Sequence, residues 1–234
     1  MKYIFTYTVL HILNIIILCL VLFLVYIQFI AENKEGFENT KKYTFIHVPK
    51  TGGSALNKVL QKYKKDFDLY SNHFHNMVAT KYNRPVLCIR EPVDRFVSLY
   101  KYWRQYITDA VPNIDTSVKH FIHLLKNESK YLLIHPIISE YHYFQQANYI
   151  DSSVYPYAVI MTYDKYNMEK KTNNLLDYLN ITEHMVSLPV QNVSKETDVY
   201  LDKEDLEFIR YKYKDDFQLW YEIQNHPEKF LKVL

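Results

Sequence analysis

The chain has 234 residues, of which 48% are hydrophobic, and this suffices for one well-buried domain of ordinary size. Its 28 basic and 26 acidic side chains leave a formal net charge of +2, which excludes the lopsided basic composition of a nucleic-acid-binding protein. Cys19 lies in an apolar leader and Cys88 in an expected core strand, so we predict no disulfide framework.

The N-terminal region divides into a short tail at 1–8, an apolar stretch at 9–30 and a polar stem at 31–42. The apolar stretch, VLHILNIIILCLVLFLVYIQFI, has the length of about 20 residues that a transmembrane helix needs. Because Phe29-Ile30-Ala31 is a poor cleavage site, we predict an uncleaved signal anchor, with a cleaved signal peptide as the alternative. The anchor predicts a domain outside the membrane or in a lumen, and three glycosylation sequons fit that placement, at Asn127, Asn180 and Asn192.

Residues 43–234 are expected to form one domain in which strands and helices alternate. We predict strands at 45–48, 68–70, 85–89 and 157–161. We predict helices at 54–63, 92–105, 121–126, 168–179 and 204–223, the last one capped by Asp202. This alternation is typical of a parallel α/β sheet whose two faces are covered.

The stretch YTFIHVPKTGGS, Tyr43 to Ser54, contains two of the three glycines of the chain. A strand that runs through a glycine turn into a helix presents free backbone N–H groups to an anion, and two glycines allow close approach. We therefore predict a phosphate or sulfate cradle formed by Lys50, Thr51, Gly52, Gly53 and Ser54. The loop departs from G-x-x-x-x-G-K-[ST] because its lysine precedes the glycine pair, and an ordinary turn is the alternative.

A second motif, PVLCIREPVDRFVSLYKYW, spans residues 85–103. Arg90 ends a predicted strand and Ser98 lies about two turns into the next helix, so both are expected to converge on one phosphate. The alternative is a salt-bridged arginine and a surface serine. Arg95 is expected to pair with Asp94 or Glu91 and so to hold the helix.

Together the two motifs resemble those of sulfotransferases that use 3′-phosphoadenosine 5′-phosphosulfate (PAPS), especially the membrane-anchored carbohydrate branch. HVPKTGGS resembles the 5′-phosphosulfate loop of that family, and IREPVDRFVSLYKYW resembles its 3′-phosphate motif, R-x-P-x-x-R-x-x-S-x-Y. Weaker similarities lie at residues 155–164, in the late loop at 188–194 and in the closing helix at 213–220. In the late loop, Gln191 stands where a histidine is common in the family.

The resemblance implies a P-loop-like parallel sheet flanked by helices, the sulfotransferase fold, after one N-terminal transmembrane helix. It implies sulfuryl transfer from PAPS, without a metal, to a hydroxyl of a carbohydrate, in the Golgi or another secretory-pathway membrane with a lumenal domain. Lys50 would stabilise the leaving oxygen, and residues 51–54 would hold the 5′-phosphate. Arg90 and Ser98 would hold the 3′-phosphate, and Asn192 and Ser194 would lie in the loop that closes over the nucleotide.

The acceptor hydroxyl needs a base whose pKa lies near neutrality, which favours histidine or glutamate. The segment SNHFHN, 71–76, contains an H-x-H pair that resembles the uronyl 2-O-sulfotransferases, where such a histidine is the base. We predict His75 as the base and His73 as its helper or substitute. A zinc site or satisfied structural histidines are the alternatives.

Two other functions remain open at this point, a P-loop-type small-molecule kinase and a degenerate, non-catalytic, membrane-tethered binding protein. Sulfation of tyrosine is a variant of the sulfotransferase hypothesis. Residues 106–143 are the expected acceptor-binding region, but the sequence does not identify the acceptor.

Overall fold

The computed structural model describes residues 17, 20–23, 43–63, 67–68, 79, 84–129, 132, 140–181, 186–188 and 198–234. Internal contacts divide the chain into a unit at 1–41 and a unit at 42–234. The second unit contains all the strands described below.

The predicted transmembrane helix is contradicted, and with it the predicted type II membrane protein of the secretory pathway. Among the residues that the structure describes, no helix is both long and apolar enough to cross a membrane. The longest of these helices, Pro92–Ala110, has 19 residues but contains charged side chains such as Arg95 and Arg104. Of the predicted span at 9–30, only Ile17 and 20–23 are described, and the rest lies outside the described residues.

Within the described residues, five strands form one parallel sheet in the order β2-β1-β3-β4-β5. Phe45 of β1 pairs with Val86 of β3, and Leu87 of β3 pairs with Ile160 of β4. The strands are β1 (Tyr43–Ile46), β2 (Phe67–Asp68), β3 (Pro85–Ile89), β4 (Val159–Thr162) and β5 (Lys232–Val233). The predicted parallel α/β sheet is therefore present, and β5 is a strand that the sequence patterns missed.

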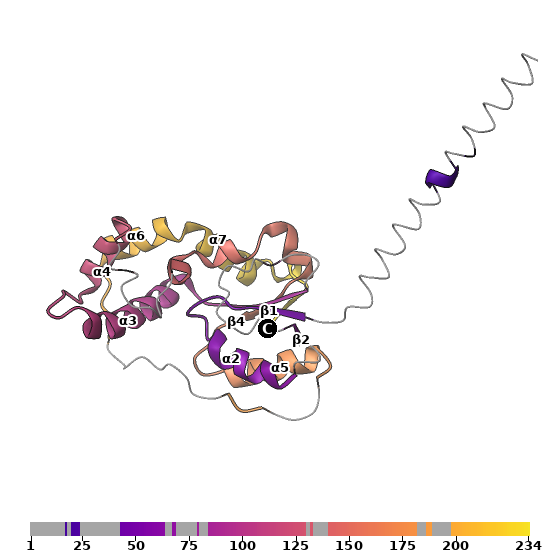
Figure 1. The fold of residues 1–234 in the computed structure, drawn as a ribbon, viewed down its shortest axis with the longest axis horizontal. Coiled ribbons are helices and arrows are strands. Elements are labelled where there is room, and N and C mark those ends of the chain that lie inside the picture. The colour runs from indigo at the N-terminus through magenta and orange to yellow at the C-terminus, as the bar shows by residue number, and fades with distance from the viewer. Residues whose placement is uncertain are drawn as a thin grey trace, which may run out of the picture. The chain divides into compact units, whose positions relative to one another are not determined.

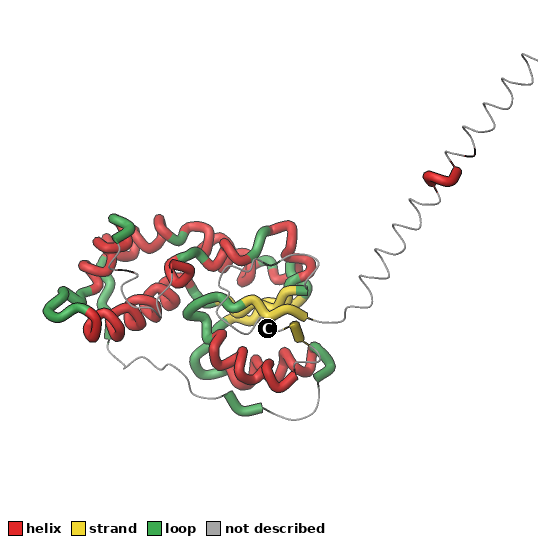
Figure 2. The backbone as a smooth tube through the Cα atoms, viewed as in Figure 1, coloured by secondary structure: helices red, strands yellow, loops and turns green. Residues whose placement is uncertain are grey.

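The α-helices agree with most of the predicted ones. They are α2 (Gly53–Leu60), α3 (Pro92–Ala110), α4 (Val118–Lys126), α5 (Met168–Tyr178), α6 (Lys203–Lys212) and α7 (Lys214–Asn225). Short 3-10 turns are η1 (Gln61–Tyr63), η3 (Glu140–Tyr143), η4 (Gln146–Tyr149), η5 (Ser152–Tyr157) and η6 (Pro227–Lys229). Figure 2 shows the strands as a small central group among these helical segments.

Alternating side chains along the strands face two separate hydrophobic clusters, one on each side of the sheet. Val86 and Cys88 of β3 belong to the cluster that includes α2 and α5. Leu87 and Ile89 belong to the cluster that includes α7, η4 and η5. Figure 1 shows the corresponding layers, with α2 and α5 on one side of the strands and α7 on the other.

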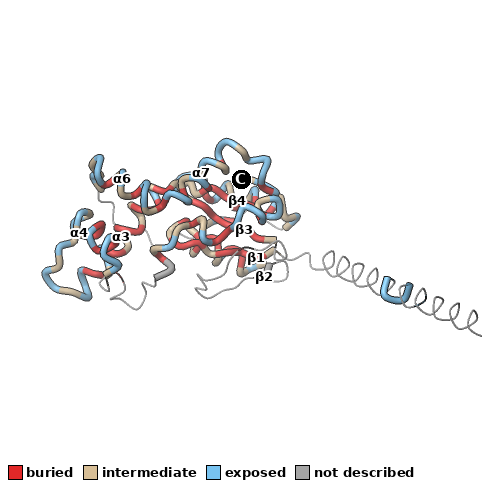
Figure 3. Tube along the Cα trace, turned by 90° about the horizontal axis from the view of Figure 1, so that it is seen from above, coloured by how far each residue is buried: buried red, intermediate tan, exposed pale blue. Residues whose placement is uncertain are grey.

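A third hydrophobic cluster joins α3, α4 and α6 around the fully buried Trp103. Figure 3 shows the buried sides of these helices turned inward and their outer sides exposed. α3 begins where the Glu91 side chain accepts a hydrogen bond from the Asp94 N–H at 2.6 Å, with Pro92 in the first turn. This start places the first turn of α3 directly after the carboxyl end of β3.

The predicted single helix over 204–223 is instead two helices, α6 and α7, which meet at Tyr213. The predicted cap is confirmed, because Asp202 and Asp205 form a reciprocal capping box at the start of α6. Ile209 and Tyr213 pack in the third cluster, whereas Leu219 and Ile223 pack against the sheet. The break lets the two helices reach different cores, which one straight helix would not do.

The strand order 2-1-3-4-5 places the topological switch point between β1 and β3. In doubly wound sheets of this order, ligands bind in the crevice outside the carboxyl ends of the two strands at the switch point. The chain leaves β1 toward Lys50 and leaves β3 toward Arg90. The fold thus places both sequence motifs at the position where such a sheet binds its ligand.

Candidate functional site

The loop that follows β1 has a backbone conformation suited to an anion. Lys50 and Gly52 both have left-handed backbones, with φ of 67° and 82°. Successive N–H groups in turns of this kind form concave nests that bind phosphates. The loop is held from within, because the Thr51 hydroxyl donates to the Val48 carbonyl at 2.8 Å and Thr51 is fully buried. Thr51 is therefore placed to serve an anion through its backbone.

The glycine pair is required by close neighbours on both sides. A Cβ on Gly52 would lie 2.9 Å from the ring of Tyr163, and a Cβ on Gly53 would lie 2.2 Å from the ring of His47. Gly53 begins α2, and no side chain among the described residues caps that helix start. The first N–H groups of a helix have no partner within the helix, so those of Gly53 and Ser54 are available to a bound anion.

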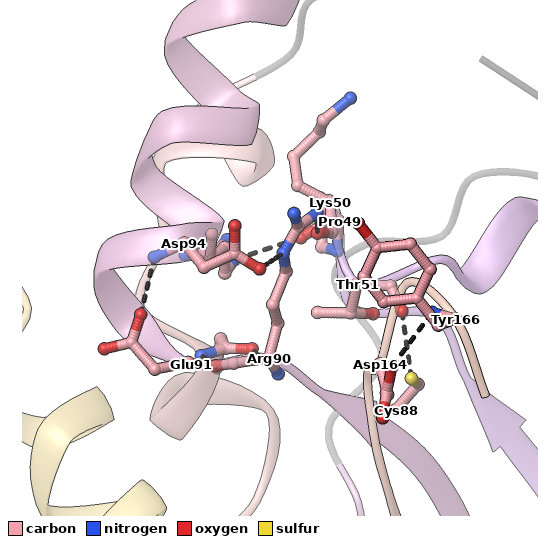
Figure 4. Close-up of polar contacts among 11 residues, drawn as sticks. Pro49, Lys50, Thr51, Cys88, Arg90, Glu91, Asp94, Asp164 and Tyr166 are labelled. Carbon is pink, nitrogen blue, oxygen red and sulfur yellow. Dashed lines mark hydrogen bonds and ion pairs between the residues drawn. The ribbon is translucent and has the colours of Figure 1, made fainter. Parts of the chain in front are cut away.

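Arg90 reaches this loop from the end of β3. Its Nη1 donates to the carbonyl of Lys50 at 3.2 Å, and its Nε pairs with Asp94 at 2.7 Å. The guanidinium also lies over the ring of Tyr163, 4.2 Å from the ring centroid. Figure 4 shows the guanidinium of Arg90 between Asp94 and the backbone of the loop. The two motifs therefore meet at one place, as the sequence predicts.

A hydrogen bond from a cysteine also joins the loop to β3. The Sγ of Cys88 donates to the carbonyl of Thr51 at 2.9 Å. Burial raises the pKa of Cys88 to about 12, so the group stays a thiol and keeps its proton for this bond. Cys88, which is a free cysteine, thus ties the loop to the neighbouring strand.

The side chain of Lys50 extends away from Arg90 (Figure 4). Its Nζ lies 3.9 Å from the ring centroid of Tyr102, a residue of α3. Burial, and then the positive charges of Arg90 and Arg95, lower the pKa of Lys50 to about 7. Burial and nearby positive charge therefore disfavour the protonated form of Lys50, and a bound anion would stabilise that form.

The other predicted site residues differ in how far the structure places them. Ser98 lies in α3, is partly buried, and its hydroxyl makes no hydrogen bond to another described residue. His73, His75, Asn192 and Ser194 lie outside the described residues. β2 pairs in parallel with β1, so both strands end at the same edge of the sheet.

Arg95 does not make the predicted pair with Asp94 or Glu91. Asp94 pairs with Arg90, and Glu91 caps α3. Arg95 instead lies 3.5 Å from Asp216 of α7, and both side chains are almost fully buried. Asp94 and Glu91 are the carboxylates nearest to Arg95 in sequence, but the position of Arg95 in α3 faces the interior.

Three residues of this site were not singled out from the sequence, namely Tyr102, Tyr163 and Asp216. A signal existed for Tyr163, because it directly follows β4 and thus stands at the same sheet edge as Arg90. Tyr102 carries a weaker signal, since it lies one helical turn after Ser98 in the second motif. Nothing in the sequence indicates that Asp216 meets Arg95.

Within the described part of the chain, no group of three or more His, Cys, Asp or Glu residues is arranged to hold a metal ion. The chemistry that the described site offers is anion binding by backbone N–H groups, one arginine and one lysine. Comparison with known proteins adds no relative, since the chain matches no protein-family model, no curated protein and no solved structure.

Proposed function

We propose that this protein transfers the sulfuryl group of PAPS to a hydroxyl of a carbohydrate acceptor. One observation carries the proposal, the contact between Arg90 and the Lys50 backbone at the β1–β3 switch point. It brings together two cationic motifs, each of which resembles one phosphate-binding motif of the sulfotransferases. The donor has two separated phosphate groups, so it requires two such motifs at one edge of the sheet.

The residues present fit these two groups. The backbone of 51–54 and the uncapped start of α2 suit the 5′-phosphate, because both present N–H donors. Arg90 suits the 3′-phosphate, since a guanidinium binds phosphate with two parallel hydrogen bonds. Asp94 and Tyr163 hold the guanidinium from two sides, which reduces the entropy lost when a ligand binds. Ser98 would add a hydroxyl donor from α3.

The donor supplies an activated sulfuryl group, whose S–O bond to the 5′-phosphate breaks as a new S–O bond forms to the acceptor oxygen. Negative charge grows on the departing phosphate, and we assign the stabilisation of that charge to Lys50. The acceptor hydroxyl loses its proton, and we assign this proton to His75, with His73 as helper. Asn192 and Ser194 would close over the bound nucleotide.

Thermal unfolding with 3′-phosphoadenosine 5′-phosphate tests the donor assignment. At about 100 times its dissociation constant, this ligand is expected to add roughly 2.7 kcal/mol to the free energy of unfolding. Replacing Arg90 by alanine is expected to weaken binding by about 10- to 100-fold, because a hydrogen bond to a charged group contributes about 1.5–3 kcal/mol.

Arg104→Ala is the matched control, since Arg104 is an exposed arginine of α3, the helix that follows Arg90, and lies outside the site. ATP with magnesium is the control ligand. A shift with ATP and magnesium in place of the bisphosphate, or equal binding by the Arg90→Ala variant, would contradict the proposal.

The affinity for the bisphosphate is expected to decline above pH 7. The pKa of Lys50 is about 7 in the free protein and rises when a dianion binds beside it. Binding above this pH must therefore take up a proton, and the affinity falls by up to about tenfold per pH unit. Titration calorimetry between pH 6.5 and 9 measures the decline.

Lys50→Arg is the matched control for this pH dependence, because a guanidinium stays protonated throughout the range. Its affinity is expected to stay nearly constant from pH 7 to pH 9. The same decline in both proteins would assign the proton to another group and would remove Lys50 from the binding site.

A further inference from the structure

The buried cation Arg95 is bonded to the loop that precedes Lys50. Its Nε donates to the carbonyl of Pro49 at 3.0 Å, and its Nη2 donates to the carbonyl of His142 at 3.3 Å. The side chain is only 2% exposed, although arginine is almost never fully buried unless it is paired. Two separate segments of the chain, the loop at Pro49 and η3, are thus bonded to this one guanidinium.

Arg95 and Arg90 together hold the two carbonyl groups that flank the backbone dihedrals of Lys50. Arg95 holds the carbonyl of Pro49, and Arg90 holds the carbonyl of Lys50 itself. Lys50 is a non-glycine residue at φ 67°, a conformation that costs about 1 kcal/mol or more and persists only where its surroundings impose it. The two arginines hold the carbonyl groups on both sides of Lys50, and they therefore help to fix where the Lys50 side chain begins.

Asp216 of α7 anchors Arg95. Its Oδ2 lies 3.5 Å from Nη1 of Arg95, and its Oδ1 accepts from the N–H of Ala147 at 3.0 Å. Asp216 is only 1% exposed, and its Oδ2 has no hydrogen-bond partner among the described residues. The positive charge of Arg95 is therefore what mainly offsets the cost of burying this oxygen. Moving α7 away would leave a buried arginine unpaired, which is strongly unfavourable.

The same region holds the second cationic motif. The side-chain amide of Gln146, next to Ala147 in η4, accepts from the N–H of Arg90 at 2.8 Å. It also donates to the carbonyl of Arg90 at 2.8 Å. The neighbouring pair of Gln145 and Asp215 repeats the link between η4 and α7, with bonds of 3.0 and 3.1 Å. One network thus supports both Lys50 and Arg90 and rests on the first turn of α7.

We propose that Arg95 is a positioning residue that, through its ion pair with Asp216, couples the phosphate-binding loop to the docking of α7. The identity of the ligand rests on the proposed function, whereas the coupling rests on the network alone. Coupling between two sites is reciprocal, so the contact with α7 tightens ligand binding and a bound ligand tightens the docking of α7.

Arg95→Lys in the 234-residue chain tests this coupling. Lysine keeps the charge for Asp216 but lacks the planar fork that reaches Asp216 and the carbonyl of Pro49 together. We expect the dissociation constant for 3′-phosphoadenosine 5′-phosphate to rise by about tenfold, within the range usual for coupled sites. In the wild-type protein, saturating ligand is expected to slow hydrogen exchange in α7 more than in α4, which lies outside the network. In the variant, this difference between α7 and α4 is expected to disappear.

Leu125→Ala is the matched control for a purely structural effect. Leu125 is a buried residue of α4 that packs in the third hydrophobic cluster and takes no part in the polar contacts that join Arg95, η4 and α7. This variant is expected to lower the unfolding temperature but to keep the dissociation constant within about twofold when measured on folded protein. If Arg95→Lys does not fold, Asp216→Asn replaces it, because asparagine still accepts from Ala147 but leaves Arg95 without its counter-charge.

The outcomes separate this inference from the proposed function. Binding by Arg95→Lys within about twofold of wild type, or equal weakening by Leu125→Ala, overturns the coupling and leaves the function standing. If wild type binds inorganic phosphate but not the bisphosphate, the donor assignment fails, and a dependence of phosphate affinity on Arg95 still supports the coupling. If wild type binds neither ligand, both proposals are wrong.

Discussion

Replacing Lys50 by alanine is expected to lower kcat for sulfuryl transfer by about 10²- to 10³-fold, the usual cost of removing one group that stabilises transition-state charge. Lys50 stands at the start of the cradle proposed for the 5′-phosphate, and its ammonium lies 3.9 Å from the ring centroid of Tyr102. In the proposed sulfuryl transfer, the negative charge on that phosphate grows as the S–O bond breaks. The effect is therefore expected mainly in kcat, with a smaller increase in the KM for the donor.

Stability measurements show whether this loss is a folding defect. The pKa of Lys50 is about 7 in the folded protein and 10.5 in a solvated lysine, so between these values only the unfolded chain holds the proton. The free energy of unfolding therefore rises with pH over this window, and below it the buried charge opposes folding. Lys50→Met, which puts an uncharged unbranched side chain beside Tyr102, is expected to be at least as stable as wild type at pH 7 and to lose as much kcat as Lys50→Ala. Full turnover by either variant would show that Lys50 is not catalytic.

Replacing His75 by alanine is expected to lower kcat by about 10²- to 10⁴-fold, the range that a general base contributes. The matched control is His73→Ala, because the two histidines are separated by one residue and only one is assigned as the base. We expect His73→Ala to retain most of its turnover. Both variants should bind 3′-phosphoadenosine 5′-phosphate as wild type does, since neither histidine is assigned to the donor.

The kinetic comparison also distinguishes the alternatives for this histidine pair. A large loss in His73→Ala alone would exchange the two roles. A structural role for the pair would be indicated by an equal loss of turnover in both variants together with lower stability. In that case, added zinc would restore the turnover of neither variant. Full turnover in both would place the base elsewhere in the chain.

The main elements of the sheet could be predicted because their signals are local. The strand at 85–89 is a continuous apolar run bounded by Pro85 and Arg90, and the structure has the same bounds for β3. The start of α3 was also predictable, since a proline after Glu91 is tolerated only in a first helical turn. The glycine pair indicated a tight turn, and the structure adds the reason, which is the closeness of Tyr163 and His47.

The errors arose where distant contacts decide the structure. The pattern of 204–223 is helical throughout, yet the chain breaks at Tyr213 so that α6 and α7 reach different hydrophobic clusters. β5 has only two residues, and its pairing with β4 is set by the packing of the segment after α7. The transmembrane prediction rested on hydropathy over 9–30, and no helix in the described part of the chain satisfies it.

The sequence by itself determined the parallel α/β class and the two cationic motifs, because hydrophobic periodicity and turn residues act over a few neighbouring positions. Only the tertiary structure decided that Arg90 holds the backbone of Lys50, that Lys50 lies over Tyr102, and that Arg95 pairs with Asp216. In each case the partners come from different elements of the structure. Packing decides whether a side chain is buried, and so which of many possible partners it meets. Asp94 and Glu91 are the carboxylates nearest to Arg95 in sequence, but Arg95 lies on the buried face of α3. Its partner is therefore Asp216, a carboxylate that α7 places in the interior.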